Sequence, residues 1–224
     1  MASSCCDETV YVLNLPNINF NISPLSIIKV IPDGSCFFHA VLRSFNLKYI
    51  RSNSTNKRQK YVQDLREALA IALEEVDPQT GLKEYDKLGG GSYAEYNKAV
   101  SGAINSNNYS LEGLQKELRS SNPVDHVYIE ILSNHLNKDI YIINALTKDL
   151  YTTGSDINLL YKNRDSIVIY YSPGHYDIIG IRRISTEKIE NVCEQGDVIF
   201  DCLFDCKHQF IQALNRRLKQ LVKN

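Results

Sequence analysis

Mainly apolar residues recur with a helical period in four parts of the chain. Just after Cys36 they fall at i, i+3, i+4, i+7 and i+8, the spacing of one buried stripe, so a core-embedded helix is predicted to begin at that cysteine. The same period predicts helices over residues 61–76, 125–136 and 201–222. The last of these has acidic residues at its start and basic residues at its end, the order that the helix dipole favours. We expect it to serve packing or interaction.

Short apolar runs predict the strands. Residues 138–145, 165–171 and 176–182 alternate or run apolar over strand length. The last two runs are joined by Ser172-Pro173-Gly174, a tight turn of hairpin type. A further apolar segment over residues 10–15 is predicted to form either a strand or a docked arm.

Glycine, proline and polar residues mark the irregular parts of the chain. Residues 25–31, dense in β-branched side chains, lead into the turn Pro32-Asp33-Gly34-Ser35, where a change of element is expected. Three glycines at positions 89–91 break regular structure, and they lack the following Lys-Ser or Lys-Thr of a phosphate-binding loop. The polar stretch over residues 93–118 is predicted to be an exposed, variable region of short helices and loops.

The composition indicates an ordinary globular chain with one principal core. Of its 224 residues, 43% are hydrophobic and 23% are charged. The 25 basic and 26 acidic residues give a net charge of −1, which removes the electrostatic argument for binding nucleic acid or an anionic membrane. No apolar run approaches the ~18 residues of a membrane span, and Asp7 and Glu8 stand where a secretory signal would carry basic residues. We therefore expect a soluble, cytoplasmic protein.

The six cysteines are few for a disulfide scaffold of this length, so free thiols are expected. Near the C terminus, a zinc site could be sought among Cys193, Cys202, Cys206 and His208. Zinc ligands usually come in two close pairs around a turn, whereas Cys202 and Cys206 fall in the helical pattern, where cysteine serves as a small core residue. We expect no metal and no cofactor.

The sequence Asp33-Gly34-Ser35-Cys36 delivers a cysteine to the first turn of a helix. Unpaired N–H groups and the positive end of the helix dipole would lower the pKa of the thiol there and make it a nucleophile. The amides of Gly34, Ser35 and Cys36 could also bind an oxyanion, and Gly34 permits close approach because it has no Cβ. The alternative is purely structural, since free cysteines are often buried and Asp and Ser are common at capped helix starts.

The predicted hairpin supplies a base for this thiol. His175 and Asp177 stand two residues apart in a strand, so their side chains share one face while that of Tyr176 points the other way. Asp177 can then hold one ring nitrogen of His175 while the other faces the sulfur, which is the orienting role of the third member of a catalytic triad. The remaining histidines have no carboxylate two residues on in a strand: His39, His126, His135 and His208.

Three stretches of the sequence resemble the ovarian tumour (OTU) family of cysteine proteases, and they occur in the family's order. They are PDGSCFFHAV at residues 32–41, HVYIEILSNHLNKDIYII at 126–143 and PGHYDII at 173–179. The resemblance implies an α+β, papain-like fold, with a small central β-sheet flanked by helices and the nucleophile at a helix N terminus. It divides the chain into an N-terminal extension (1–24), a catalytic domain (25–183) and a C-terminal helical extension (184–224).

The resemblance also implies the chemistry of the site. The catalytic roles fall on four residues: the nucleophile Cys36, the general base His175, the orienting acid Asp177, and Asp33, which shapes the oxyanion turn. The implied activity is that of a deubiquitinase, a thiol-dependent hydrolase of amide and isopeptide bonds at the C terminus of ubiquitin or a ubiquitin-like modifier.

The same resemblance suggests how substrate is held. Ubiquitin ends in Arg-Gly-Gly, so a narrow channel walled by Gly174, Tyr176 and the Asp33 turn would admit its glycines, while residues 93–122 would hold its body. The family usually has a tryptophan–glycine pair shortly before its middle helix; here residues 121–124 read Ser-Asn-Pro-Val, and the chain has no tryptophan. This departure concerns the substrate-binding arm and leaves the triad intact.

The expected partners are therefore ubiquitin or polyubiquitin chains, with no nucleic acid, no membrane span and a monomeric state. Rich use of Asn, Ile, Lys and Tyr suggests an AT-rich genome, such as that of a large DNA virus or an intracellular bacterium, which would place the protein in the host cytoplasm. Two other functions stay open: a catalytically silent ubiquitin-binding module of the same fold, and a scaffold that acts through the helix predicted at residues 201–222.

Overall fold

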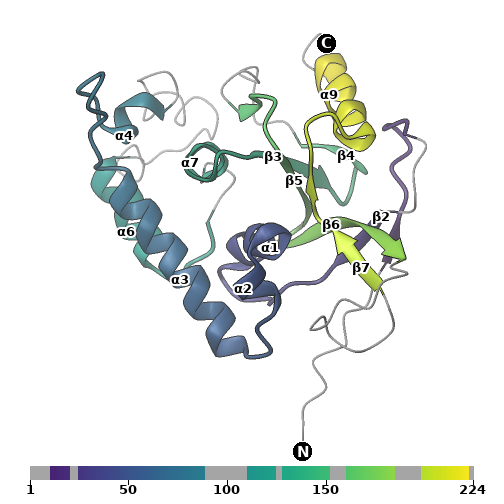
Figure 1. Ribbon diagram of the computed structural model, residues 1–224, viewed down its shortest axis with the longest axis horizontal. Coiled ribbons are helices and arrows are strands. Elements are labelled where there is room, and N and C mark those ends of the chain that lie inside the picture. The colour runs from purple at the N-terminus through teal and green to yellow at the C-terminus, as the bar shows by residue number, and fades with distance from the viewer. Residues whose placement is uncertain are drawn as a thin grey trace, which may run out of the picture.

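The structure, a computed structural model, describes residues 11–20, 25–88, 110–124, 128–151, 160–184 and 198–221. A mixed sheet separates two helical layers, with α9 on one face and α1, α3, α6 and α7 on the other (Figure 1). This arrangement confirms the expected α+β class. The helices are α1 (Cys36–Phe45), α2 (Leu47–Ile50), α3 (Thr55–Ala72), α4 (Glu84–Lys87), α6 (Leu111–Arg119), α7 (Tyr128–Leu136) and α9 (Gln209–Leu221).

The sheet is mostly antiparallel, and its order along the main path is β1-β2-β6-β5-β3-β4. Only β3 and β5 run parallel among the described strand pairs. The strands are β1 (Tyr11–Leu13), β2 (Leu25–Ile28), β3 (Asp139–Asn144), β4 (Asp149–Leu150), β5 (Ser166–Ser172), β6 (His175–Ile184), β7 (Val198–Asp201) and β8 (Leu203–Phe204).

The central strands are apolar on both faces because both faces are covered. Ile140 and Ile142 of β3 belong to the core cluster formed with α1, α3, α6 and α7. Tyr141 and Ile143, which point the other way, belong to the cluster formed with α9. Continuous apolar runs are typical of strands that are buried on both sides, which explains why residues 138–145 read as a strand without clean alternation.

The sheet curls where β5 and β6 separate, beyond the pair Ile169–Ile178. The later part of β6 pairs with β7 and the start of β5 pairs with β8, so residues 198–204 fill the space between the two strands. A Cβ on Gly180 would lie 2.7 Å from Cys202 Sγ, closer than real Cβ atoms approach a neighbour. Glycine at position 180 therefore lets the returning chain pack against β6.

The prediction of a helix over residues 201–222 is wrong at its start, because α9 begins only at Gln209. The preceding residues form β7 and β8, and then Asp205 closes a turn, accepting from the N–H of Lys207 on its carboxylate at 2.7 Å. Cys202 and Cys206 consequently lie outside any helix. Of the two expected roles, packing or interaction, the structure shows packing, because the apolar face of α9 is buried on the sheet; its buried residues are Phe210, Ile211, Ala213, Leu214 and Leu218.

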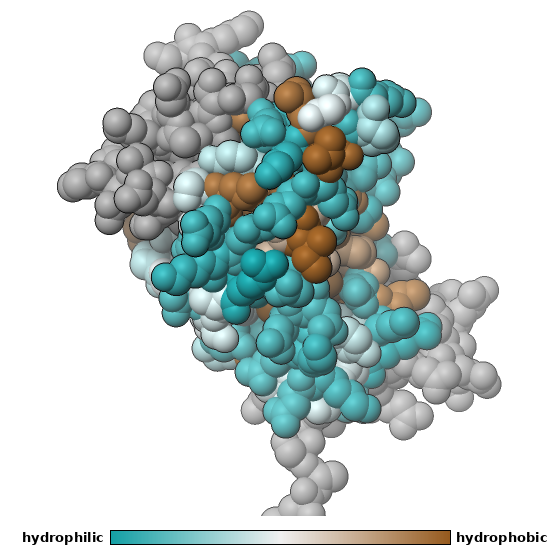
Figure 2. Space-filling model, turned by 90° about the vertical axis from the view of Figure 1, so that its left-hand side faces the viewer, coloured by the Kyte–Doolittle hydropathy of each residue, from teal (hydrophilic) through white to brown (hydrophobic). Residues whose placement is uncertain are grey.

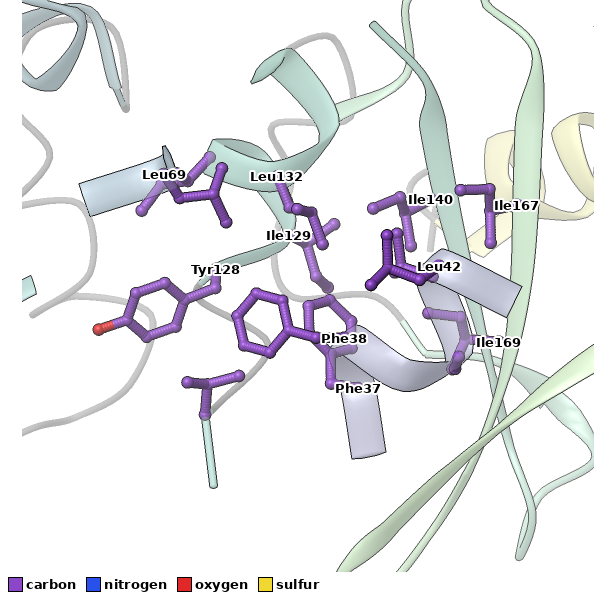
Figure 3. Packing of buried hydrophobic residues seen from close by; sticks show 14 of the residues in the cluster. Phe37, Phe38, Leu42, Leu69, Tyr128, Ile129, Leu132, Ile140, Ile167 and Ile169 are labelled. Atoms are coloured by element: carbon purple, nitrogen blue, oxygen red, sulfur yellow. The ribbon is translucent and has the colours of Figure 1, made fainter. Parts of the chain in front are cut away.

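Helix α1 crosses the middle of the core and fixes the place of Cys36 at its start. Phe37 and Phe38 lie between Tyr128 and Ile129 of α7 on one side and Ile169 of β5 on the other (Figure 3). The predicted helix start at Cys36 is confirmed. Because packed interiors are as dense as organic crystals, a helix surrounded in this way cannot shift freely along its axis.

Helix α3 starts earlier than the predicted helix over residues 61–76, since Ser54 caps it by accepting from the N–H of Lys57 at 3.4 Å. It ends at Ala72 rather than at residue 76. Figure 2 shows the face over α3 and α6, which is largely hydrophilic with separate apolar spots. Ile71, Val76 and Leu82, in and just after α3, are exposed.

Several predictions fall outside the described residues: the three glycines at positions 89–91, most of the polar region over residues 93–118, His126 and Cys193. Within the described part, no three His, Cys, Asp or Glu side chains gather where they could hold a metal ion. None of the described helices is both long enough and apolar enough to cross a membrane. The domain boundaries at residues 24 and 183 stay a prediction, although β1, β7, β8 and α9 all join the same sheet or core.

Candidate active site

The turn before Cys36 is built around the Asp33 carboxylate. Its Oδ1 accepts from the N–H of Ser35 at 2.8 Å, and its Oδ2 is bonded to Gln59 Nε2 at 3.2 Å and His39 Nε2 at 3.1 Å. Burial by itself would raise the pKa of Asp33, but the hydrogen bonds from Ser35, Gln59 and His39 outweigh burial and hold the pKa below its ordinary value. Asp33 is thus an ionised hub that shapes the turn.

His39 supports this hub from inside the core. It is fully buried, and its Nδ1 lies 2.7 Å from the hydroxyl of Tyr49. Burial lowers the pKa of His39 despite the nearby Asp33 carboxylate, so the ring is neutral at pH 7. A neutral ring that donates from Nε2 to Asp33 accepts at Nδ1 from the Tyr49 O–H, which satisfies both nitrogens.

Cys36 is 6% exposed, and it begins α1, the helix that packs against β6. Burial raises the pKa of the Cys36 thiol, and the Asp33 charge adds to this, against the backbone N–H groups of Tyr176, Phe37 and Cys36 itself. The lowered pKa expected from the helix start is therefore wrong, because desolvation of the thiol outweighs the backbone N–H groups that favour the thiolate. A thiol in this environment needs a base before it can attack.

The thiolate fraction of Cys36 gives a direct pH test. We expect alkylation of Cys36 by iodoacetamide to rise with pH and to reach its midpoint above the ~8.5 of an ordinary thiol. Asp33→Asn should move the midpoint to lower pH, because the charge that opposes the thiolate is gone while the amide oxygen can still accept from Ser35. Peptide mass spectrometry of samples quenched across a pH series measures both.

Asp64→Asn is the matched control for this titration, since it removes an exposed carboxylate that pairs with Lys60 on α3. It should leave the alkylation midpoint unchanged. An unchanged midpoint in Asp33→Asn as well would contradict the assigned role of the Asp33 charge.

The hairpin of β5 and β6 brings the predicted base and acid together. His175 and Asp177 share a face of β6, and His175 Nε2 lies 2.9 Å from Asp177 Oδ1. Asp177 is fully buried; its Oδ1 also accepts from the N–H of Val30 at 3.2 Å, and its Oδ2 accepts from Lys29 Nζ at 2.7 Å. The carboxylate is held from three sides, so the ring of His175 is fixed at Nε2, and Nδ1 is the nitrogen left for a sulfur.

A hollow of about 280 Å³ opens at Cys36, and its walls come from three distant parts of the chain. Tyr176 packs between the rings of Phe37 and Tyr171, with ring centroids 5.3 and 5.0 Å apart. Gly174 has a φ of 79°, the left-handed conformation that glycine adopts easily in a tight turn after proline. The lining residues are Gly34, Cys36, Phe37, Pro123, Val124, Tyr171, Gly174 and Tyr176.

Gly34 permits a close approach of the protein's own chain. A Cβ at this position would lie 2.3 Å from the carbonyl oxygen of Ser121 and 3.3 Å from Pro123. The segment that follows α6 therefore rests directly on the turn before Cys36. A second hollow, of about 670 Å³, lies behind the turn between α3 and this segment.

Sequence reasoning missed three contributors to the site: Lys29 and Val30, which hold Asp177, and Arg66, which reaches the turn from α3. A signal for Arg66 existed. It stands four residues after Val62 and three before Leu69, so it falls on the buried stripe of its helix, where a charged residue is unusual.

A buried thiol at a helix start, beside a strand that begins with a hydrogen-bonded imidazole and carboxylate, is an arrangement suited to a papain-like thiol hydrolase. The family model described as OTU-like cysteine protease matches residues 31–176, more than half of the chain. The chain belongs to this family of cysteine proteases.

Solved structures with a similar course of the chain include an ovarian tumour domain in complex with ubiquitin, at 17% identity and a TM-score of 0.47, covering 89% of this chain and 86% of that one. The OTUD1 OTU domain has 17% identity and a TM-score of 0.39, covering 69% and 85%. The viral OTU domain protease from Farallon virus has 15% identity and a TM-score of 0.38, covering 78% and 98%. None of the curated proteins compared matches the chain.

Proposed function

We propose that this protein is a deubiquitinase, which hydrolyses the amide or isopeptide bond after the C-terminal glycine of ubiquitin with a triad of Cys36, His175 and Asp177. One observation carries the proposal: Cys36 lines the same hollow as Tyr176, the residue between the base and the acid, in a chain of the OTU-like cysteine protease family. The roles of the three side chains follow from their chemistry.

In the first step the Cys36 sulfur attacks the carbonyl carbon of the scissile bond, and its proton passes to Nδ1 of His175. The imidazolium that forms is stabilised by Asp177, whose Oδ1 is 2.9 Å from Nε2. The raised pKa of the Cys36 thiol supports a base-assisted attack, because the resting sulfur keeps its proton at neutral pH.

The tetrahedral intermediate carries its negative charge on oxygen, and backbone amides of the Asp33 turn stabilise it. Three amides were predicted for this role, but that of Ser35 is donated to Asp33 Oδ1 at 2.8 Å. We assign the oxyanion to the amides of Gly34 and Cys36, the second of which makes only a longer, 3.2 Å bond within the turn. Asp33 acts indirectly by holding the turn.

Collapse of the intermediate breaks the C–N bond, and the imidazolium gives its proton to the leaving amine. A thioester between Cys36 and the ubiquitin carboxyl group remains. His175 then takes a proton from water as the water attacks the thioester, which releases the carboxylate and returns the thiol. The cycle needs no cofactor beyond water.

Substrate choice follows from the walls of the hollow at Cys36. Two of its lining residues, Gly34 and Gly174, have no side chain, while Tyr171 and Tyr176 form an aromatic wall. A passage of this kind favours an extended chain with small side chains at the scissile bond, which supports the Gly-Gly end of ubiquitin as substrate.

Ubiquitin whose C-terminal carboxylate is replaced by a thiol-reactive electrophile tests the proposal. We expect one covalent adduct of equal stoichiometry, found on Cys36 by peptide mapping. A matched probe in which both terminal glycines are alanine should react far more slowly, because its methyl groups do not fit between the walls. Folded protein that binds ubiquitin without forming an adduct would instead favour a silent binding module.

A further inference from the structure

Arg66 is a buried cation that the proposed reaction does not use directly. It stands in the middle of α3, is 3% exposed, and stacks on the ring of Phe38 with 4.8 Å from Cζ to the ring centroid. Burying a guanidinium is costly unless its N–H groups are bonded. Four hydrogen bonds compensate: Nη1 to Ser35 Oγ at 2.9 Å, Nε to the carbonyl of Leu118 at 2.8 Å, and Nη2 to the carbonyls of Glu117 at 2.9 Å and Asn122 at 3.1 Å.

These four bonds reach the two sides of the cleft at Cys36. Ser35 is the residue before the nucleophile, and its amide completes the Asp33 turn. The other three acceptors belong to the end of α6 and the segment after it, which continues into Pro123 and Val124 of the cleft wall. One side chain on α3 thus joins the oxyanion turn to the opposite wall.

The contact at Gly34 shows that the turn before Cys36 packs closely against the segment after α6. The Ser121 carbonyl oxygen lies only 2.3 Å from the position that a Cβ of Gly34 would take, so the turn and the wall touch without any side chain between them. Arg66, which lines the larger hollow of about 670 Å³, bonds to the chain neighbours of both contact residues, Ser35 next to Gly34 and Asn122 next to Ser121. A loss of these bonds would let the wall move away from the turn and let the amides of the turn change direction.

We propose that Arg66 is a positioning residue for the hydrolysis: it holds the turn at Ser35 and the segment of residues 117–122 so that the amides of Gly34 and Cys36 meet the oxyanion. This role rests on the proposed function, yet the geometry it protects can be measured without the reaction. A fixed guanidinium fork suits the task, because it bonds several carbonyls at set angles, whereas a lysine would act as one flexible point charge.

Two variants and one control test the role. Ser35→Ala removes a single bond to Arg66, and kcat on a ubiquitin-coupled fluorogenic substrate should fall about tenfold, the factor that a single lost hydrogen bond supplies. Arg66→Lys keeps the charge but loses the fork, and kcat should fall about 10²-fold, as for a misplaced catalytic group. In both, KM should stay near the wild-type value.

Gln115→Leu is the matched control. Gln115 is buried and donates to the carbonyl of Ala70 at 2.9 Å, so it also joins α6 to α3, but it does not reach the turn. The variant should lower the melting temperature and leave kcat unchanged. If Ser35→Ala and Arg66→Lys likewise lose only melting temperature, Arg66 is a structural residue and the proposal is overturned.

Hydrogen exchange separates this outcome from a failure of the proposed function. Amides in residues 33–38 and 117–124 should exchange faster in Arg66→Lys than in wild type, and not in Gln115→Leu, whether or not ubiquitin is the substrate. If the folded wild-type protein does not react with the ubiquitin electrophile, only the deubiquitinase assignment is contradicted. If the amide exchange rates of both segments are the same in Arg66→Lys as in wild type, only the positioning role is contradicted.

Discussion

Replacing Cys36 with alanine is expected to lower hydrolysis of a ubiquitin-coupled fluorogenic substrate by about 10⁴-fold or more, because the covalent route through the thioester is lost. The variant should also form no adduct with the ubiquitin electrophile. Alanine suits the first turn of α1, and the side chain that it replaces is small and lies at the edge of the core. The loss should therefore be one of chemistry, with a melting temperature close to that of wild type.

The control for this experiment is a second thiol. Cys206 is half-buried in the turn before α9 and is more accessible than Cys36. Cys206→Ser should react with the electrophile and turn over substrate as wild type does. An adduct that persists in Cys36→Ala and disappears in Cys206→Ser would reverse the assignment of the nucleophile.

Replacing His175 with alanine is expected to reduce kcat by about 10³- to 10⁴-fold, since general-base activation of a thiol with a raised pKa is lost. Asp177→Asn should reduce kcat by only about 10²-fold, because the amide oxygen can still accept from His175 Nε2. The loss that remains arises because the NH₂ group of the amide would face the ammonium of Lys29, which is also a donor. Steady-state kinetics of the two variants show which one loses more kcat.

Imidazole in the buffer sharpens this test. It should restore part of the activity of His175→Ala, since the space left by the ring lies at a partly exposed position, and it should not help Asp177→Asn. Wild-type turnover by His175→Ala would remove the base assignment. A larger loss in Asp177→Asn than in His175→Ala, with both variants folded, would mean that Asp177 acts through the fold rather than through the imidazole.

Local patterns predicted the parts of the site that depend on near neighbours in the chain. The helix start at Cys36 follows from a turn of Pro, Asp, Gly and Ser before an amphipathic period. The pairing of His175 with Asp177 follows from the two-residue repeat of a strand. Both rules act over a few residues, so distant contacts did not change their outcome.

Other features depended on contacts between distant segments and were missed. Residues 198–204 form strands because β5 and β6 separate and leave room beside Gly180, a vacancy that no local pattern reports. The helical reading over residues 201–222 failed there, since a short apolar run fits either element until its neighbours are known.

The sequence by itself determined the local placement of the residues to which we assign the chemistry: a cysteine at a helix start, and an imidazole and a carboxylate on one strand face, each set by backbone geometry within one element. The tertiary structure decided how those residues behave. Burial raises the pKa of the Cys36 thiol, Lys29 and Val30 hold Asp177, and Arg66 joins the turn to its facing wall. Desolvation and hydrogen-bond partners come from segments far apart in the chain, so they exist only once the chain has folded.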